Sequence, residues 1–299
     1  MKIDVIILSN TINETIWQMN SHCINSLLDS ESFSMFGSIF IVETNTNATF
    51  AYHPAVKIIK PNLPFNFNRF LKIGINSSDS EFVALCNNDL IFNKGWFSEI
   101  KKVKLQNREI RSFAPIDYDY WGTTTERYPD TSSFYLGYNI RTEIPGWCIV
   151  VERNLIKEIG LFDEQFDFYY SDNDYSMVLY KNQIKHALCT KSHVKHLGSK
   201  NTTEVHINKN NSRKMIEAEG GKKLPKCLQS PSNAWIYENP KMMEGYMKFH
   251  FKWGSEASIR FRKNLLSKFK IMEKTWYRLL FSDPLNYLFS LQIRSWHLK

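Results

Sequence analysis

The sequence has few cysteines, and no two of them are closely spaced. Its 299 residues include five, namely Cys23, Cys86, Cys148, Cys189 and Cys227. Without a CxxC pair or a high cysteine density, the chain does not belong with disulfide-stabilised scaffolds. Because several of the five stand inside apolar runs, we expect buried free thiols in a reducing compartment.

Long apolar runs are also missing. No stretch approaches the ~18 apolar residues that a membrane-spanning helix requires. The opening segment, "MKIDVIILSN", carries an acid and only four clustered apolar residues. This pattern is typical of a first β-strand and not of a signal peptide, so we expect a cytoplasmic protein.

Most of the chain lacks an excess of positive charge. The net charge is +8, from 38 basic and 30 acidic residues. Residues 255–299 alone hold nine Lys or Arg against three acids, a net charge of +6. The remaining body is close to neutral, which argues against a nucleic-acid-binding surface across it.

Short apolar runs alternate with helical patterns from the first residues onward. Residues 5–8, 38–44, 55–60 and 81–86 are typical of strands. Their alternation with helices predicts βαβ units in an α/β protein with an open, parallel sheet. Polar clusters follow three of these strands: Ser9-Asn10, Glu43-Thr44-Asn45 and Asn87-Asn88-Asp89. Ligands bind beyond the carboxyl ends of strands in such sheets, so we expect the functional site at this edge.

The second half is less regular. Residues 111–145 predict a loop-rich excursion with short strands, and residues 146–166 predict a strand followed by a helix over Arg153–Ile159. A further helix and two closing strands, "HALCT" and "SHVKHLG", are expected after it.

The segment "SDND" at 171–174 has two interpretations. Ser171 and Asp174 have the spacing of a capping box, and Asp172 would lie in the first helical turn, where the helix dipole favours a carboxylate. Both acids would then only stabilise the helix. In the other interpretation, Asp172 points into a cleft as a general base.

The order of these motifs resembles that of family-2 glycosyltransferases over roughly residues 2–255. The matching segments are "VIILSN", "IFIVETN", "FNFNRFLKIGINSSDSEFVALCNND", "NKGW", "GWCIVVERNLIKEIGLFDEQF", "SDND", "SHVKHLGS" and "KFHFKWG". Each is weak alone, and the resemblance depends on their order and spacing. It implies a GT-A (Rossmann-like) fold, with a mixed, mostly parallel sheet flanked by helices, over residues 1–254. Residues 255–299 would form a C-terminal helical extension.

The resemblance also implies roles for individual residues. Asp89 and His196 would bind a divalent cation, Mn²⁺ or Mg²⁺, that bridges the donor diphosphate. The nucleotide-sugar would contact Ser9, Asn10, Glu43, Asn68, Arg69, Asn87 and Asn88. Gly146 and Trp147 would flank the acceptor, and Asp172 would be the catalytic base.

Several of these residues have structural alternatives. Glu43 could be an exposed acid at a strand end, and Trp147 could be ordinary core. His196 could be a solvated loop histidine, and His193 is its neighbour and rival. The chain departs from the family pattern at Asn87, where an acid is usual, and at Ser171, where a glutamate usually precedes the base.

The implied activity is inverting transfer of a sugar from a nucleotide-sugar to a hydroxyl of a carbohydrate or lipid-linked acceptor, in the synthesis of surface polysaccharide, glycolipid or glycoprotein glycan. One rival function is sugar-phosphate nucleotidyl transfer. It needs a glycine-rich loop after the first strand, and "SNTINET" contains no glycine. The other is a non-catalytic carbohydrate-binding or scaffolding protein on the same fold.

Two segments outside the predicted core have open interpretations. The lysine-rich residues 199–226 predict either a lid over the diphosphate, with Lys200, Lys209 or Arg213 near phosphate, or a simple flexible loop. In the tail, Pro284 predicts a break between two helices. Their mixture of basic and aromatic residues suits peripheral contact with the inner membrane face, or packing on the domain or on a second subunit of a homo-oligomer.

Overall fold

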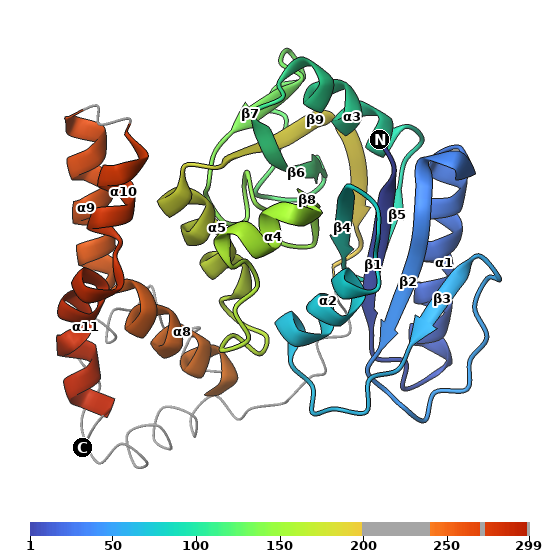
Figure 1. Ribbon diagram of the computed structural model, residues 1–299. Helices are drawn as coiled ribbons and strands as arrows, with labels where there is room; N and C mark the ends of the chain where they lie inside the picture. Colours follow the sequence, from blue (N-terminus) through green and yellow to red (C-terminus); the bar gives the residue numbers. More distant parts are fainter. Residues whose placement is uncertain (199–239, 270–272, 298–299) are drawn as a thin grey trace.

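The protein is built around one twisted mixed β-sheet. The computed structural model describes residues 1–198, 240–269 and 273–297 (Figure 1). Its strands are β1 (Ile3–Ser9), β2 (Phe36–Glu43), β3 (Val56–Ile59), β4 (Phe82–Cys86), β5 (Leu90–Phe92), β6 (Ile110–Ile116), β7 (Phe134–Leu136), β8 (Cys148–Glu152) and β9 (Lys185–His196). They lie in the order β3-β2-β1-β4-β8-β6-β9-β5, and β7 also pairs with β9.

Most of these strands run in one direction. The parallel pairings are β1 with β2 and β4, β2 with β3, and β6 with β9. β8 lies antiparallel between β4 and β6, while β5 and β7 lie antiparallel to β9. The described sheet therefore has six strands in one direction and three in the other, which confirms the predicted mixed, mostly parallel sheet.

Helices cover both faces of the sheet, as the alternating pattern predicts. On one face, α1 (Glu14–Ser30) and α3 (Trp96–Gln106) bury apolar side chains against the sheet, and α3 lies over β6 and β9. On the other face, the cover comes from α2 (Phe67–Asn76), α4 (Arg153–Ile159) and α5 (Ser171–Asn182). A short 3₁₀ helix, η1 (Phe33–Met35), leads into β2.

The polar triplet 87–89 marks the point where the chain leaves one strand and joins another. β4 ends at Cys86 beside β1 and β8, whereas β5 begins at Leu90 and pairs with the end of β9. The two apolar runs on either side of the triplet are therefore separate strands. The three polar residues form the connection between them, at the expected edge of the sheet.

The predicted capping box at the start of α5 is wrong. The helix begins at Ser171, and its N-cap is Tyr170, which has a left-handed backbone and makes no capping bond through its side chain. The Ser171 hydroxyl instead donates to Asn68 Oδ1 of α2 at 2.6 Å. Asp174 is buried and bonds to another helix, as described below.

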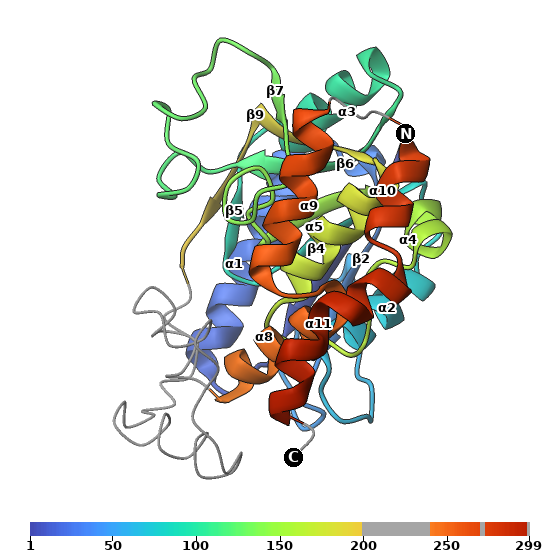
Figure 2. The ribbon, with the colours of Figure 1, turned by 90° about the vertical axis from the view of Figure 1, so that its left-hand side faces the viewer.

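The C-terminal region forms a third layer of helices, outside α4 and α5 (Figure 2). It consists of α8 (Pro240–Trp253), α9 (Glu256–Lys268), α10 (Lys274–Leu280) and α11 (Asp283–His297). The predicted break at Pro284 lies directly before it, between α10 and α11, and Pro284 is the second residue of α11. Proline is favoured at this position since the first turn of a helix leaves its N–H groups unpaired.

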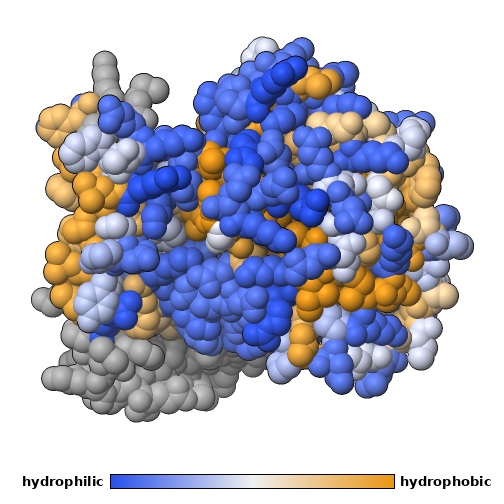
Figure 3. Space-filling view, viewed as in Figure 1, coloured by the Kyte–Doolittle hydropathy of each residue, from blue (hydrophilic) through white to orange (hydrophobic). Residues whose placement is uncertain are grey.

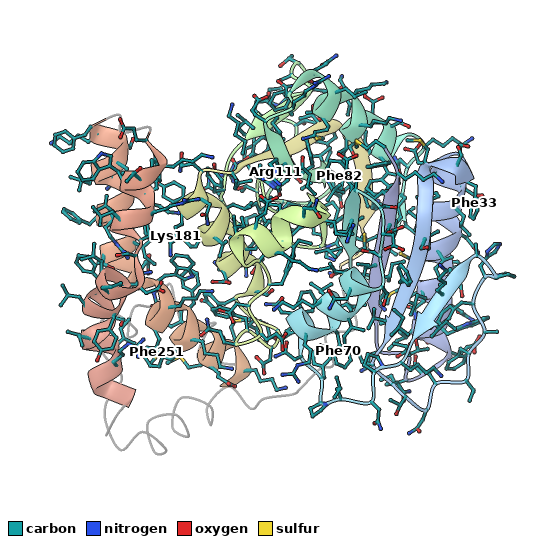
Figure 4. All side chains as sticks on the ribbon, in the orientation of Figure 1. Phe33, Phe70, Phe82, Arg111, Lys181 and Phe251 are labelled. Carbon is teal, nitrogen blue, oxygen red and sulfur yellow. The ribbon has the colours of Figure 1, made fainter. Side chains whose placement is uncertain are left out.

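The described part of the tail packs on the domain, one of the alternatives left open by the sequence. The rings of Tyr180 on α5 and Tyr277 on α10 lie 5.2 Å apart. Lys181 of α5 lies between that helix and the tail and pairs with Asp283 at 3.6 Å (Figure 4). Arg262 of α9 is buried and donates a hydrogen bond to the carbonyl of Trp253, so the tail and α8 form one packed unit.

Three further expectations concern the chain as a whole. Within the described ranges, no helix is long and apolar enough to cross a membrane. Cys23, Cys86, Cys148 and Cys189 are buried and free, as predicted. The predicted lid, residues 199–226, lies outside the described residues.

Candidate active site

Polar segments from neighbouring strands meet at one edge of the sheet. β1, β2 and β4 run in parallel and end there. β8 runs the opposite way and pairs Cys148 with Cys86, so that β8 begins where β4 ends. Residues 146–147, before β8, therefore lie beside residues 87–89, after β4. The donor-side and acceptor-side residues predicted from the sequence come together here.

At the ends of β1 and β2, Glu43 is the centre of a buried network. Its carboxylate accepts hydrogen bonds from Thr11 N at 3.0 Å and Thr11 Oγ1 at 2.6 Å. Asn20 Nδ2 lies 2.8 Å from Ser9 Oγ and 2.9 Å from the hydroxyl of Tyr52. Glu43 is fully buried, so it is not the exposed strand-end acid that was its alternative.

The network reaches the interrupted strand through one amide pair. Asn88 Nδ2 donates to Asn20 Oδ1 at 2.7 Å. Asn10 is exposed, whereas the side chains of Asn87 and Asn88 are half-buried. Sequence reasoning missed Asn20, although its spacing of four residues from Ile16 places an amide within the buried stripe of α1.

Asn68 and Arg69 lie on α2 and connect it to the segment before α5. Asn68 is fully buried, donates to the carbonyl of Asp163 at 2.7 Å and accepts from Ser171. Arg69 pairs with Glu164 at 2.9 Å, and both of these side chains are more than one third exposed. These contacts hold the start of α5 beside α2.

The two predicted metal ligands face each other. Asp89 Oδ2 lies 3.3 Å from His196 Nε2, and Asp89 is 3% exposed. The indole of Trp147 is stacked on the imidazole of His196, with ring centres 5.7 Å apart and planes at 9°. The main-chain N–H of His196 donates to Asp117 Oδ2 at 2.8 Å, which fixes the end of β9. His196 is therefore held in place from two sides, and the interpretation as a solvated loop residue is wrong.

The polar atoms of this pair fit a cation. Both carboxylate oxygens of Asp89 and Nε2 of His196 are buried and have no hydrogen-bond partner among the described residues. Leaving a buried carboxylate unsatisfied is costly, and a carboxylate with a neutral imidazole is a common ligand set for Mn²⁺ or Zn²⁺. Over the described part of the chain, no cluster of three or more His, Cys, Asp or Glu side chains suits a metal, so other ligands would have to come from elsewhere.

Trp147 lies differently from its predicted place beside an acceptor sugar. It is 3% exposed, and its ring is covered on one face by His196. Its Nε1–H is also buried without a partner among the described residues. In this arrangement the indole supports His196 and does not present a free face to a sugar.

Asp172 lies in the first turn of α5 and lines a cleft shared with Asn87 and Gly146. Burial raises the pKa of its carboxyl group, while the N–H of Asn173 and the positive charge of Arg141 act in the opposite direction. Gly146 has φ = +87°, and a Cβ atom there would lie 3.2 Å from Asp172 Oδ2. A glycine is therefore needed at position 146 for both its backbone and its space.

Asp174, two residues further along α5, has a role that the sequence did not reveal. It is 1% exposed, and its carboxylate contacts Lys252 Nζ at 2.8 Å and Trp253 Nε1 at 2.7 Å, both from the end of α8. Burial raises its pKa, and Lys252 and Trp253 oppose the rise. The segment "KFHFKWG" therefore anchors the helix that carries Asp172.

The comparisons with known proteins identify the fold through structure alone. No protein-family model and no curated protein sequence matches this chain. Among solved structures, GalNAc-T7 with UDP, GalNAc and Mn²⁺ aligns at 11% identity with a TM-score of 0.51. The alignment covers 83% of this chain and 55% of the GalNAc-T7 chain, so this chain spans about half of that protein.

TarS from S. aureus (residues 1–349) also aligns, at 11% identity and a TM-score of 0.49, over 100% of this chain and 90% of that one. The conclusion on the fold therefore depends on the higher-scoring match to GalNAc-T7. The chain has the GT-A glycosyltransferase fold that its motifs predict.

Proposed function

We propose that this protein is an inverting glycosyltransferase that moves a sugar from a nucleotide-sugar donor to an acceptor hydroxyl, with a divalent cation bound by Asp89 and His196. The observation that carries this proposal is the buried Asp89–His196 pair, whose three facing polar atoms have no partner among the described residues. The bound Mn²⁺ and UDP of GalNAc-T7 support it by analogy of fold.

The donor would lie along the carboxyl edge of the sheet. In this proposal Ser9 and Glu43 of the buried network and the exposed Asn10 form the nucleoside side, and Asn87 and Asn88 donate hydrogen bonds to ribose or phosphate. A divalent cation, when bound, offsets the negative charge that develops on the departing diphosphate. Trp147 keeps the imidazole of His196 turned toward Asp89.

The resemblance also places Asn68 and Arg69 at the nucleotide. In this proposal Asn68 supports the catalytic helix as well. Because Asn68 bonds to Ser171, it fixes the helix turn that carries the base. Arg69 is partly exposed beside Glu164 and remains within the proposed donor side.

Asp172 would be the general base. An acceptor hydroxyl must lose its proton as it attacks, and a positioned carboxylate contributes typically ~10²–10⁴-fold to such a step. The raised pKa of Asp172 makes its carboxylate a stronger base than an exposed aspartate. A single base opposite the leaving group gives one displacement and inversion at the anomeric carbon. Gly146 leaves room for the acceptor beside this carboxylate.

The first experiment is donor hydrolysis with UDP-, GDP- and dTDP-sugars, with and without Mn²⁺. Wild type should release one nucleoside diphosphate in a metal-dependent reaction, and Asp89→Asn should abolish this release. Asp130→Asn is the matched control, because Asp130 is a half-exposed carboxylate that pairs with Lys191 away from the sheet edge. Metal-independent release would remove the roles of Asp89 and His196. Sugar binding without hydrolysis would favour the non-catalytic alternative.

We also propose peripheral contact with a membrane through the outer face of the tail, where lipid-linked acceptors would be reached. This face exposes Phe261, Phe269, Trp276, Leu279, Tyr287, Leu288 and Leu291. Apolar side chains are visible along the tail at the left edge of the space-filling view (Figure 3). Co-sedimentation of the full chain with anionic vesicles tests this contact, and a concentration-dependent mass in light scattering would indicate a second copy instead.

A further inference from the structure

The segment that opens α2 turns its amides inward and its phenyl groups outward. In the sequence "FNFN", residues 65–68, Asn66 is 7% exposed and Asn68 is fully buried. Phe65, by contrast, is 46% exposed, and Phe67 is only half-buried. Buried polar groups and contiguous exposed apolar groups are the two departures from ordinary packing that most often mark a binding surface. Both occur here within four residues.

The inward groups join this segment to the loop before α5 (Figure 1). Asn66 Nδ2 donates to the carbonyl of Glu164 at 2.7 Å. The main-chain N–H of Phe67 donates to the carbonyl of Asp167, also at 2.7 Å. Asn68 bonds to the same loop, as described above. The two segments are therefore fixed side by side through their main chains, and the outward direction of the phenyl groups follows from these bonds.

The outward rings of the two segments form one continuous surface. The ring of Phe168, which is 43% exposed, has its centre 5.8 Å from that of Phe67 and 6.4 Å from that of Phe65. Tyr169 packs on Phe168 from the same loop, with ring centres 4.9 Å apart. We call Phe65, Phe67 and Phe168 the aromatic rim.

The aromatic rim is continuous with the cleft of the proposed base. Phe67 and Asp172 line this cleft together with Asn87 and Gly146. Phe168 contacts Phe67 and is itself exposed, so the apolar surface runs from the cleft out to solvent. A molecule that places a hydroxyl at Asp172 and extends past Phe67 therefore meets the rest of the aromatic rim next.

The chemistry of the aromatic rim indicates what kind of group it binds. Its three side chains have no hydrogen-bond donor or acceptor, so the hydroxyls of a sugar would lose water there without gaining a partner. A sugar ring also stacks on one flat aromatic face, whereas the rings of Phe65 and Phe67 lie at 51° and 88° to the ring of Phe168. A flexible hydrocarbon chain needs no polar partner and is stabilised by leaving water.

We propose that the aromatic rim binds a hydrocarbon chain carried by the acceptor, and that the acceptor is a sugar joined to such a chain. This inference rests on the proposed function and narrows its acceptor. The sugar keeps its place beside Gly146 and Asp172, and the chain attached to it runs over Phe67 toward Phe65 and Phe168. The aromatic rim belongs to α2 and the loop before α5, so it is separate from the exposed face of the tail.

The test measures binding and does not require turnover. Calorimetric titration of the full-length protein compares n-octyl glucoside, kept below its micelle concentration, with methyl glucoside, which has the same sugar and no chain. Wild type should bind the octyl compound saturably and should not bind the methyl compound. Phe65→Ser/Phe168→Ser should weaken octyl binding at least about tenfold, because it removes two of the three apolar groups that cover the chain.

Two further double variants guard against misfolding and against binding elsewhere. Phe65→Leu/Phe168→Leu keeps apolar side chains but no flat rings, so it should retain most of the octyl binding. Phe261→Ser/Phe269→Ser removes two exposed phenyl groups from the tail, at 60% and 64% exposure, and should bind like wild type. Melting temperatures of all three variants show whether each is folded.

Four results would each overturn the proposal. They are equal binding of the octyl and methyl compounds, no octyl binding at all, loss of binding in the tail variant and not in the Phe65→Ser/Phe168→Ser variant, and equal loss in the leucine and serine variants, which would indicate stacking on a flat ring. Failure of the proposed function is recognised separately. If donor hydrolysis fails while octyl binding that depends on the aromatic rim remains, the rim stands and the proposed transfer does not.

Discussion

The contact between α5 and α8 yields a quantitative prediction. Lys252 Nζ lies 2.8 Å and 3.0 Å from the two carboxylate oxygens of Asp174, which is almost fully buried. Lys252→Met keeps the apolar stem and removes the charge, so Asp174 loses its cationic partner. Removing one member of a buried ion pair typically costs ~3–5 kcal/mol of unfolding free energy. We expect a loss of that size in denaturant titrations followed by circular dichroism.

The double variant Lys252→Met/Asp174→Leu separates the buried charge from the packing. It no longer buries the Asp174 carboxylate. Its remaining defects are the unpaired Nε1–H of Trp253, worth ~1–3 kcal/mol, and the loss of the surface contact of Lys252 with Asp163 at 2.8 Å. The double variant should therefore be more stable than Lys252→Met alone. If Lys252→Met costs less than ~1 kcal/mol, or if the second substitution adds to the loss, the assignment of Asp174 as the anchor of α5 is wrong.

The dependence on pH provides an independent check. Burial raises the pKa of Asp174, and Lys252 opposes this rise, so the pKa should be higher still in Lys252→Met. When the pKa of an acid is higher in the folded than in the unfolded protein, the protonated acid favours the folded state at low pH. This contribution to stability is complete below the unfolded pKa and is lost as the pH rises through the folded pKa. The difference in unfolding free energy between wild type and Lys252→Met should therefore become smaller as the pH is lowered from 8 to 5. A difference that stays constant with pH would contradict this account.

Three further predictions concern the site and its support. Burial raises the pKa of Asp172, so kcat/KM should fall as the pH drops through this raised value. Asp172→Asn should lower kcat/KM ~10²–10⁴-fold at neutral pH. A pH profile of kcat/KM without an acidic limb would contradict the role of Asp172 as base. Gly146→Ala should cost ~1–2 kcal/mol of stability and also reduce kcat. Gly95→Ala is the control, because Gly95 has φ = +79° and nothing lies within 4 Å of the added Cβ, so this variant should lose stability but not kcat. Equal kcat in the two variants would show that the space beside Asp172 is not needed. Burial lowers the pKa of His186 to about 4, so between pH ~6.5 and ~4 the unfolded chain binds a proton that the folded chain does not. As the pH is lowered through this range, the free energy of unfolding should fall by ~3 kcal/mol more in wild type than in His186→Gln. Parallel curves of unfolding free energy against pH would show that His186 does not titrate in this way.

The strands could be predicted because both faces of the sheet are covered. Runs such as "VIIL" and "FVALC" become buried strands in the structure, and the helix predicted over Arg153–Ile159 has those bounds. A strand covered on both faces has to be continuously apolar, so its signal is local and strong. The proposed long-range contact between Asp89 and His196 came from the order of motifs, since spacing alone does not bring two residues 107 positions apart together.

Other features depend on contacts that no local pattern encodes. "HALCT" and the first five residues of "SHVKHLG" lie in one 12-residue strand, because β9 pairs first with β6 and then with β5. The carboxylate of Asp174 looked like a helix cap, since the lysine and tryptophan that bind it lie 78 and 79 residues away. The left-handed backbone of Arg141, with φ = +63°, is imposed by neighbouring loops, and its own residue type gives no sign of it.

The reversed direction of β8 has a consequence for how this protein can diversify. The strands β6 and β8 are adjacent and antiparallel, and the chain between them rejoins the sheet only at β7, which pairs with β9. The intervening residues therefore begin and end at neighbouring points of the same edge. Lengthening or shortening the loops on either side of β7 would change neither the strand register nor the pairing of β1, β2 and β4, and lengthening a loop costs little free energy. Under the proposed function, the side that would select the acceptor can thus evolve as a replaceable insert, while the side that would bind the donor stays fixed in the sheet.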